Sequence, residues 1–177
     1  MDTTPEEYIV LVDEQGNVIG SAPKLASHHA KTPLHKAFSC YLFDTDGRVL
    51  VTRRARSKKV WPGVWTNSFC GHPAPDESDE DAIRRRGAFE LGATVADIQV
   101  QLPDYRYKTP PFNGIVENEI CPVYFATLKG DIAPNPEEVE EYRWMEWDKF
   151  LRDTKKRPDE YSYWTKDQLQ HLAKQDL

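Results

Sequence analysis

Long hydrophobic runs are absent from the sequence. No apolar stretch approaches the roughly 18 residues that a membrane-spanning helix needs. The first residues are acidic (Met1, Asp2, Glu6, Glu7) and lack the basic and apolar segments of a secretory signal. Cysteine is scarce, and three residues in a chain without a signal predict reduced thiols rather than disulfides. These absences predict a soluble protein of the cytoplasm.

An excess of basic residues is also absent. The formal net charge is −6 at pH 7, which argues against a nucleic-acid-binding protein, because such proteins normally carry a basic face. No Ser/Gly-rich linker or low-complexity block divides the 177 residues, so we expect one domain over residues 1–177. The hydrophobic fraction of 39% and the aromatic fraction of 11% exclude general disorder.

Strand patterns dominate what is present. Expected strands lie at residues 8–12, 38–43, 49–52, 64–70, 98–107, 115–128 and 142–147. The clearest helix begins near Ser78, a candidate N-cap with Asp81 three residues on, and ends at Leu91, where Gly92 stops it. A second helix is expected over residues 163–174. Strands interrupted by helices predict an α+β or mixed α/β fold.

Two short patterns each place reactive groups two residues apart. Cys70 and His72 flank a glycine, and Glu117 and Glu119 flank an asparagine. In extended segments, alternation puts both members of each pair on one face. If the two strands lie side by side, a thiol, an imidazole and two carboxylates meet in one pocket. That combination predicts acid/base chemistry at a metal site.

Each pair also has a structural interpretation. A free cysteine is usually a small buried hydrophobe, but Ser68, His72 and Pro73 around Cys70 are poor core residues. Glu117 and Glu119 are consistent with a solvated strand face. Because polar residues occur on both sides of that segment, the sequence indicates either a lined cavity or an exposed edge, and both remain open.

The spacing of two other histidines is ambiguous. His28 and His35 are seven residues apart, which on a continuous helix is about 10.5 Å. Two ligands of one metal must lie within roughly 4.2 Å of each other, so a straight helix excludes a shared ion. Pro33 between them favours a turn, which permits one. On spacing alone, solvated loop residues are the favoured interpretation.

Residues 53–59 carry five positive charges in an otherwise acidic protein. The simplest interpretation is a solubilising loop, as for most charge runs. The functional alternative is a clamp for a phosphate or diphosphate, which arginine binds through paired hydrogen bonds.

Residues 71–93 resemble the Nudix box, G-x5-E-x7-R-E-U-x-E-E-x-G-U, where U is aliphatic. The matching positions are Gly71, Glu77, Arg85, Glu90 and Gly92. Arg86 stands where the box has a glutamate, Phe89 replaces a second glutamate, and Gly87 fills an aliphatic position. Hydrolases of this superfamily use those glutamates to hold metals that activate water. The departures therefore disfavour hydrolysis, although the fold is expected to be retained.

With these departures, residues 66–73 and 114–119 resemble one branch of the superfamily, the type I isopentenyl-diphosphate delta-isomerases. The likeness runs from about residue 8 to residue 164 and includes the strings at 34–38, 52–54 and 61–65. It implies a Nudix-type α/β/α sandwich with a mixed sheet and extra N-terminal strands.

The resemblance also implies a set of ligands. The implied metal ligands are His28, His35, His72, Glu117 and Glu119, a set that suits Mn²⁺, Mg²⁺ or Zn²⁺. Glu90 is implied to hold a second ion, Mg²⁺, that bridges to a substrate diphosphate. The implied diphosphate-binding residues are Lys24, Arg54, Lys58 and Arg86.

The implied reaction is a reversible 1,3-proton shift that converts isopentenyl diphosphate to dimethylallyl diphosphate in isoprenoid biosynthesis. We expect Glu119, helped by Tyr107, to protonate the alkene while Cys70 removes the allylic proton, each serving in both roles because the reaction is reversible. Trp164 is implied to face the cation. For Tyr107 and Trp164, a core packing role is the alternative. The reaction is redox-neutral, so no organic cofactor is expected.

Two rival functions make different predictions. A Nudix pyrophosphohydrolase would release phosphate or pyrophosphate, and the missing glutamates weigh against it. A non-catalytic module with a structural metal would unfold on chelation, and the basic segment weighs against it. The expected partner is a small diphosphate substrate, without nucleic acid or membrane, and the chain is expected to be a monomer or a weak homodimer.

Overall fold

A seven-stranded sheet forms the centre of the molecule, for which a computed structural model describes residues 6–174. Met1 and Asp2, part of the acidic start noted above, lie outside the described residues. The strands of this sheet are β4 (Phe38–Phe43), β5 (Val49–Arg54), β6 (Trp65–Thr66), β7 (Phe69–Gly71), β8 (Thr94–Leu102), β11 (Val123–Lys129) and β12 (Val139–Met145). The main order is β12-β5-β4-β11-β8, with β6 paired to β5 and β7 paired to β4. Because β11 is parallel to β4 and antiparallel to β8, the sheet is mixed.

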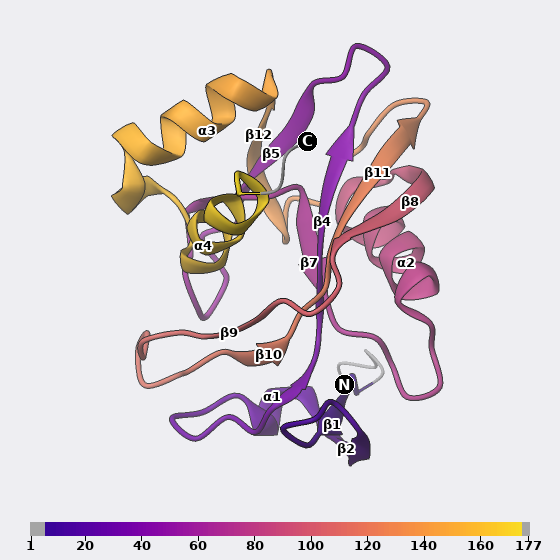
Figure 1. Cartoon of the computed structure of the whole chain (residues 1–177), viewed down its shortest axis with the longest axis vertical. Helices are drawn as coiled ribbons and strands as arrows, with labels where there is room; N and C mark the ends of the chain where they lie inside the picture. The colour runs from indigo at the N-terminus through magenta and orange to yellow at the C-terminus, as the bar shows by residue number, and fades with distance from the viewer. Residues whose placement is uncertain (1–5, 175–177) are drawn as a thin grey trace.

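A smaller sheet of five strands lies at one end of the central sheet (Figure 1). Its strands are β1 (Tyr8–Val12), β2 (Val18–Pro23), β3 (His35–Lys36), β9 (Arg106–Lys108) and β10 (Asn118–Ile120). The order is β2-β1-β3-β10-β9, so the N-terminal strands extend a sheet whose other strands come from the middle of the chain.

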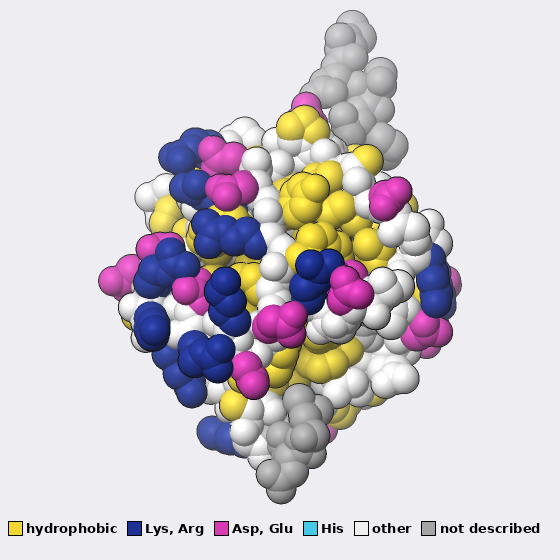
Figure 2. Space-filling view, turned by 90° about the horizontal axis from the view of Figure 1, so that it is seen from above, with side chains coloured by type: hydrophobic (Ala, Val, Ile, Leu, Met, Phe, Trp, Pro, Cys, Tyr) yellow, Lys and Arg dark blue, Asp and Glu magenta, His cyan; other side chains and the backbone are white. Residues whose placement is uncertain are grey.

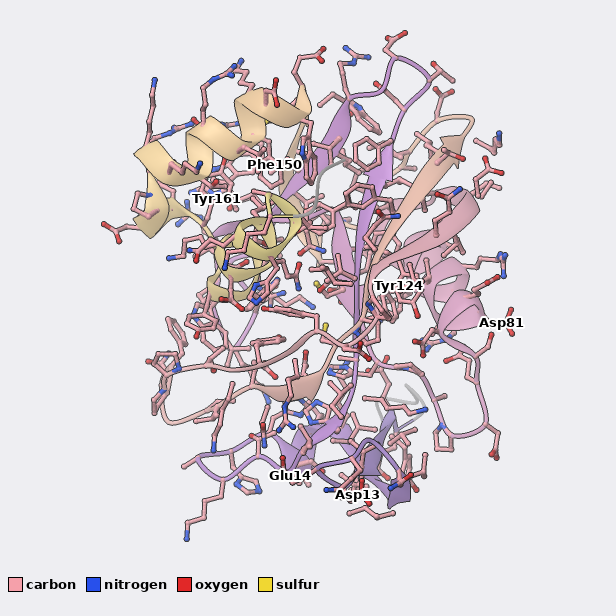
Figure 3. The ribbon with its side chains drawn as sticks, in the orientation of Figure 1. Asp13, Glu14, Asp81, Tyr124, Phe150 and Tyr161 are labelled. Carbon is pink, nitrogen blue, oxygen red and sulfur yellow. The ribbon has the colours of Figure 1, made fainter. Side chains whose placement is uncertain are left out.

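Helices cover both faces of the central sheet (Figure 1). These helices are α2 (Asp79–Leu91), α3 (Trp147–Lys156) and α4 (Tyr163–Leu172), with a 3-10 turn η1 (Pro158–Glu160) between α3 and α4. The short helix α1 (Lys24–Ser27) instead lies beside the smaller sheet. The helix α2 lies on one face of the sheet and covers one buried hydrophobic cluster. The helices α3 and α4 lie on the other face and together cover a second cluster. Phe150 of α3 packs against Tyr161 with ring centroids 5.9 Å apart (Figure 3). The predicted α/β/α sandwich with N-terminal strands is confirmed.

The sequence signals at the ends of α2 correspond to its hydrogen bonds. The Ser78 hydroxyl accepts a hydrogen bond from the Asp81 amide at 3.1 Å, as an N-cap does. Gly92 ends the helix with φ of +59°, a conformation that glycine adopts without strain. Gly87 has a packing reason, because a Cβ there would lie 2.6 Å from a methyl carbon of Val95. The glycine therefore lets α2 lie directly against β8.

Two expected strands are each divided by a proline. Pro103 follows β8 and Pro122 follows β10, so residues 98–107 and 115–128 each form two strands. The expected strand at 142–147 is wrong at its end, because Trp147 starts α3 instead. Alternating aromatic and charged residues give a strand signal up to Trp147, but burial of Phe150 on the core side of α3 favours a helix from that point.

The face of the molecule drawn in Figure 2 carries side chains of both charges. Lys and Arg side chains gather along one side of that face and are interspersed with acidic ones (Figure 2). Within residues 6–174, no helix combines the length and the apolar character needed to cross a membrane.

Candidate active site

Both spaced pairs face one cavity of about 440 Å³. Cys70 is on β7 of the central sheet, and Glu119 is on β10 of the smaller sheet. His72 and Glu117 line the same cavity, so the cavity lies where the two sheets meet. Of the two alternatives left open for the glutamates, the lined cavity is the correct one.

Three imidazoles gather beside this cavity, of which His28 and His72 line it and His35 is fully buried. The ring centroids of His28, His35 and His72 are 5.1 to 5.6 Å apart. Ligand atoms of these residues and of Glu119 all lie within 4.8 Å of one another. The parallel pairing of β3 with β10 sets His35 beside Glu119. The solvated-loop interpretation is therefore wrong for His28, whereas it holds for the exposed His29.

Backbone carbonyl groups orient two of the imidazoles. The Nδ1 atom of His28 lies 2.6 Å from the Lys24 carbonyl oxygen, and that of His35 lies 2.9 Å from the Pro33 carbonyl oxygen. An imidazole whose Nδ1 faces a backbone carbonyl keeps Nε2 available as a metal ligand. The two carbonyl groups therefore orient both rings for ligation through Nε2.

Carboxylates face these lone pairs. His28 Nε2 lies 3.5 Å from Glu117, and His35 Nε2 lies 3.5 Å from Glu119. Among the described residues, His35 Nε2 and Glu117 Oε2 are buried without a hydrogen-bond partner. Burial also lowers the pKa of His72 to about 4, despite the adjacent Glu119, so this ring is neutral at pH 7. Lone pairs and carboxylates that face each other fit a bound divalent cation.

Glu119 is held from the opposite side by a phenol. The Tyr107 hydroxyl donates to Glu119 Oε2 at 2.8 Å, as the pairing of β9 with β10 allows. Burial raises the pKa of Glu119, but the interactions with His35 and His72 outweigh it and leave that pKa well below its usual value. Burial raises the pKa of Tyr107, so the phenol stays a donor.

Cys70 is a thiol with polar neighbours rather than an inert core residue. Its Sγ donates to Asn67 Oδ1 at 3.2 Å and lies 3.2 Å from the Ser39 hydroxyl. Burial raises the pKa of Cys70 to about 12, although both of these contacts act in the opposite direction. The proton therefore resides on sulfur at neutral pH.

Trp164 is buried in the core and also lines the cavity. It is 5% exposed, and its indole donates to Thr66 Oγ1 at 3.0 Å and to Asn67 Oδ1 at 3.2 Å. It also lines the cavity, with the Arg54 guanidinium 5.5 Å from its ring centroid. The indole is therefore a core anchor with one exposed face toward the cavity. Its role toward a cation remains a prediction.

Sequence reasoning missed Asn67, which joins Cys70 to Trp164. Its amide nitrogen donates to the Cys40 and Phe69 carbonyl groups at 3.0 and 2.8 Å. This arrangement turns Oδ1 toward the thiol and the indole. The only sign of this role in the sequence is a polar amide side chain within the expected strand at residues 64–70.

The basic segment 53–59 divides between the two interpretations offered for it. Arg54 and Lys58 line the cavity, as do Lys24, Arg86 and the carboxylate of Glu90. The exposed side of the segment is different, because Arg53 and Arg56 pair with Glu140 of β12. The predicted clamp residues are therefore together, and the remaining arginines belong to a solvated surface.

Two matching positions of the Nudix box brace the loop that carries His72. Arg85 pairs with Glu77 at 2.7 Å and donates to the His72 carbonyl oxygen at 3.1 Å. Gly71 allows a close approach, since a Cβ there would lie 2.8 Å from the Arg86 side chain. These residues place the histidine loop against α2.

Comparisons with known proteins agree with this site. The NUDIX domain model matches residues 33–166. The isopentenyl-diphosphate Delta-isomerase of Corynebacterium efficiens is 55% identical over 174 residues, covering 96% of this chain and 92% of the relative. The enzyme of the same name from Corynebacterium glutamicum (strain R) is 52% identical, covering 94% and 91%.

Solved structures support the fold alone. DR0079 from Deinococcus radiodurans superposes with a TM-score of 0.63 at 19% identity, covering 83% of this chain and 88% of that one. The MutT protein from Methanosarcina mazei Go1 gives a TM-score of 0.62 at 18% identity, covering 80% and 94%. The chain belongs to the NUDIX domain family and, within it, to the isopentenyl-diphosphate Delta-isomerases.

Proposed function

We propose that the protein catalyses the reversible 1,3-allylic proton shift that converts isopentenyl diphosphate to dimethylallyl diphosphate in isoprenoid biosynthesis. The observation that carries this proposal is the meeting of Cys70 and the Tyr107–Glu119 pair in one cavity that also holds the cationic side chains. One part of the cavity supplies proton donors and acceptors, and the other supplies charge for a diphosphate.

Protonation of an unactivated alkene is difficult because it creates a tertiary carbocation without a heteroatom to share the charge. The reaction needs one acid and one base at the allylic unit, with water excluded. We assign Glu119, assisted by the phenol of Tyr107, as the acid of the forward direction. Cys70 then removes the allylic proton, and the two exchange roles in reverse.

A protonated Cys70 together with an ionised Glu119 corresponds to the end of a forward turnover. Burial raises the pKa of Cys70, which keeps the thiol, while His35 and His72 favour the carboxylate of Glu119. Forward catalysis therefore begins after Cys70 has released its proton, which leaves the thiolate that acts as base, and after Glu119 has gained one from solvent. This reset explains why solvent hydrogen is expected to enter the product.

The metal ligands act on the same carboxylate. His28, His35, His72, Glu117 and Glu119 would hold a Mn²⁺, Mg²⁺ or Zn²⁺ ion. Such an ion supplies positive charge that tunes the acidity of Glu119. The indole face of Trp164 would stabilise the carbocation by about 2 kcal/mol where it is desolvated.

The second part of the cavity binds the diphosphate. Lys24, Arg54, Lys58 and Arg86 line this part and would contact its oxygens. Glu90 would hold a Mg²⁺ ion, which would supply further positive charge for the diphosphate. Because diphosphate is normally a leaving group, these contacts serve binding and leave the C–O bond intact. Arg86 thereby has a role at the position where hydrolases carry a glutamate.

We further propose that residues 1–177 form one catalytic domain that acts as a monomer or a weak homodimer. The cytoplasm is the proposed compartment, in keeping with three cysteines that are free thiols. Isopentenyl diphosphate is the proposed partner molecule, without a nucleic acid or a membrane.

The test is incubation with isopentenyl diphosphate and Mg²⁺ in deuterated water, followed by NMR of the products. We expect dimethylallyl diphosphate that carries deuterium, and no release of phosphate or pyrophosphate. An intact, metal-loaded protein that neither isomerises nor exchanges hydrogen contradicts the proposal, and phosphate release supports a hydrolase instead. A protein that unfolds on chelation supports a structural metal module.

A further inference from the structure

Arg86 lies among three carboxylates rather than one. Its Nε donates to Glu90 at 3.0 Å, one turn further along α2. Glu7, which precedes β1, lies 3.6 Å from the guanidinium, and Glu138, which precedes β12, lies 3.7 Å from it. Glu90 is already proposed as a Mg²⁺ ligand, and the side chain of Glu7 is half exposed. Glu138 has no role so far, and its side chain is only 14% exposed.

Glu138 contacts the basic segment at two points. Its backbone oxygen accepts a hydrogen bond from the Ala55 amide at 3.0 Å. Its side-chain oxygen Oε2 pairs with the ammonium group of Lys58, and the Lys58 amide closes a turn onto the Ala55 carbonyl at 3.2 Å. Glu138 therefore fixes both ends of the turn that carries Lys58 into the cavity.

The same oxygen, Oε2 of Glu138, faces both Lys58 and Arg86. An ammonium group has three N–H donors and a guanidinium has five, so each cation keeps donors for a second anion. Lys58 has a flexible stem of four carbons, and without an anchor it would lose much side-chain freedom on binding a ligand. A carboxylate that already holds both cations reduces this loss.

We propose that Glu138 is a positioning residue for diphosphate binding, which holds Lys58 and Arg86 side by side with their free N–H groups toward the cavity. This inference rests on the proposed function, because it takes the cavity's anion to be a diphosphate. Glu138 acts through the two cations and does not touch the reacting carbons. Its removal therefore weakens substrate binding and leaves the proton transfers largely intact.

The first test replaces Glu138 by glutamine, which keeps the shape and removes the charge. Glu138→Gln is expected to raise KM for isopentenyl diphosphate about tenfold, because charge-assisted contacts to two cations are lost. The kcat value should change less than twofold. Calorimetric titration with inorganic pyrophosphate and Mg²⁺ should show a similar rise in Kd, which follows binding independently of turnover.

A double-mutant cycle with Lys58→Met separates positioning from general loss of structure. In the Lys58→Met background, Glu138→Gln should raise the Kd for pyrophosphate less than threefold, since the principal side chain to be positioned is gone. Equal effects in both backgrounds, or a lower Kd in the single variant, overturn the proposal. A lower Kd means that Glu138 merely repels the anion.

Glu140→Gln is the matched control. Glu140 lies on β12, two residues after Glu138, and pairs with Arg56 of the basic segment at 2.8 Å, but neither Glu140 nor Arg56 lines the cavity. Its KM and Kd should match those of the wild type. If Glu138→Gln does not fold, Glu138→Asp is measured in its place, because it keeps the charge but withdraws the carboxylate.

A wild-type protein that binds pyrophosphate without isomerising the substrate contradicts the proposed function. In that case the Kd cycle still decides the role of Glu138. The two failures are therefore distinguishable.

Discussion

The two parts of the cavity differ in how their charges are arranged. In the part where the sheets meet, imidazoles and carboxylates face one another, and His35 Nε2 and Glu117 Oε2 lack a hydrogen-bond partner among the described residues. In the part toward α2, three cations already pair with a carboxylate, namely Lys24 with Glu7, Lys58 with Glu138 and Arg86 with Glu90. Arg54 instead donates to the backbone oxygens of Val60 and Trp61.

This difference indicates different requirements for a ligand. The first part contains buried polar atoms without a hydrogen-bond partner, so a bound cation would stabilise it. In the second part most of the positive charge is already paired, so an incoming anion must share cations that are engaged with carboxylates or backbone carbonyls. We therefore expect substitutions in the first part to affect turnover or metal content, and substitutions in the second to affect substrate affinity.

The largest expected effect is on the proton-transfer pair. Cys70→Ala and Glu119→Gln should each lower kcat by about 10⁴-fold, because each removes one of the two groups that move a proton. Turnover is measured by conversion of isopentenyl diphosphate, and circular dichroism checks the fold. Tyr124→Phe is a control, since that hydroxyl donates to Asp79 on α2 (Figure 3 labels Tyr124). A kcat above one tenth of the wild-type value in either variant is incompatible with the assignment.

Loss of one imidazole should have the next largest effect. His35→Asn is expected to reduce the bound metal well below one ion per chain and to lower kcat about 100-fold, because a buried ligand nitrogen is removed. Metal content is measured by mass spectrometry of the purified protein. His171→Asn, at an exposed position on α4, should keep the metal. Full metal content in His35→Asn contradicts the assignment of this ligand.

A smaller effect is expected where a residue supports the acid without carrying the transferred proton. Tyr107→Phe removes the 2.8 Å hydrogen bond to Glu119 but keeps the ring. A hydrogen bond to a charged group contributes about 1.5–3 kcal/mol, so kcat should fall by about 10- to 100-fold. KM for the substrate should stay within twofold of the wild-type value. A rise in KM at constant kcat would instead assign Tyr107 to binding.

The sequence was most informative where local chemistry decides the structure. The ends of α2 follow from Ser78 and Gly92, since an N-cap hydroxyl and a left-handed glycine act within one turn. The alternation around His72 and Glu119 likewise predicts a shared face within each segment. These features need no information about distant parts of the chain.

The sequence was least informative where the site depends on pairing between distant segments. The spacing of His28 and His35 favoured solvated residues, and only the parallel pairing of β3 with β10 brings His35 beside Glu119. Asn67 carries no sign of its two carbonyl partners. Such contacts depend on tertiary packing, which residue spacing along one segment does not encode.

The smallest effect should come from the compensated part of the cavity. Lys24→Met keeps most of the stem but removes the ammonium group, which is shared with Glu7. Because the other cations remain, KM should rise only about tenfold, with kcat within twofold. Lys31→Met, at an exposed position nearby, should leave KM unchanged. The rise in KM should also diminish at high salt, since screening weakens the wild-type attraction. A fall in kcat at constant KM would show that the two parts of the cavity are not separable, because a binding cation would then act on the proton transfer.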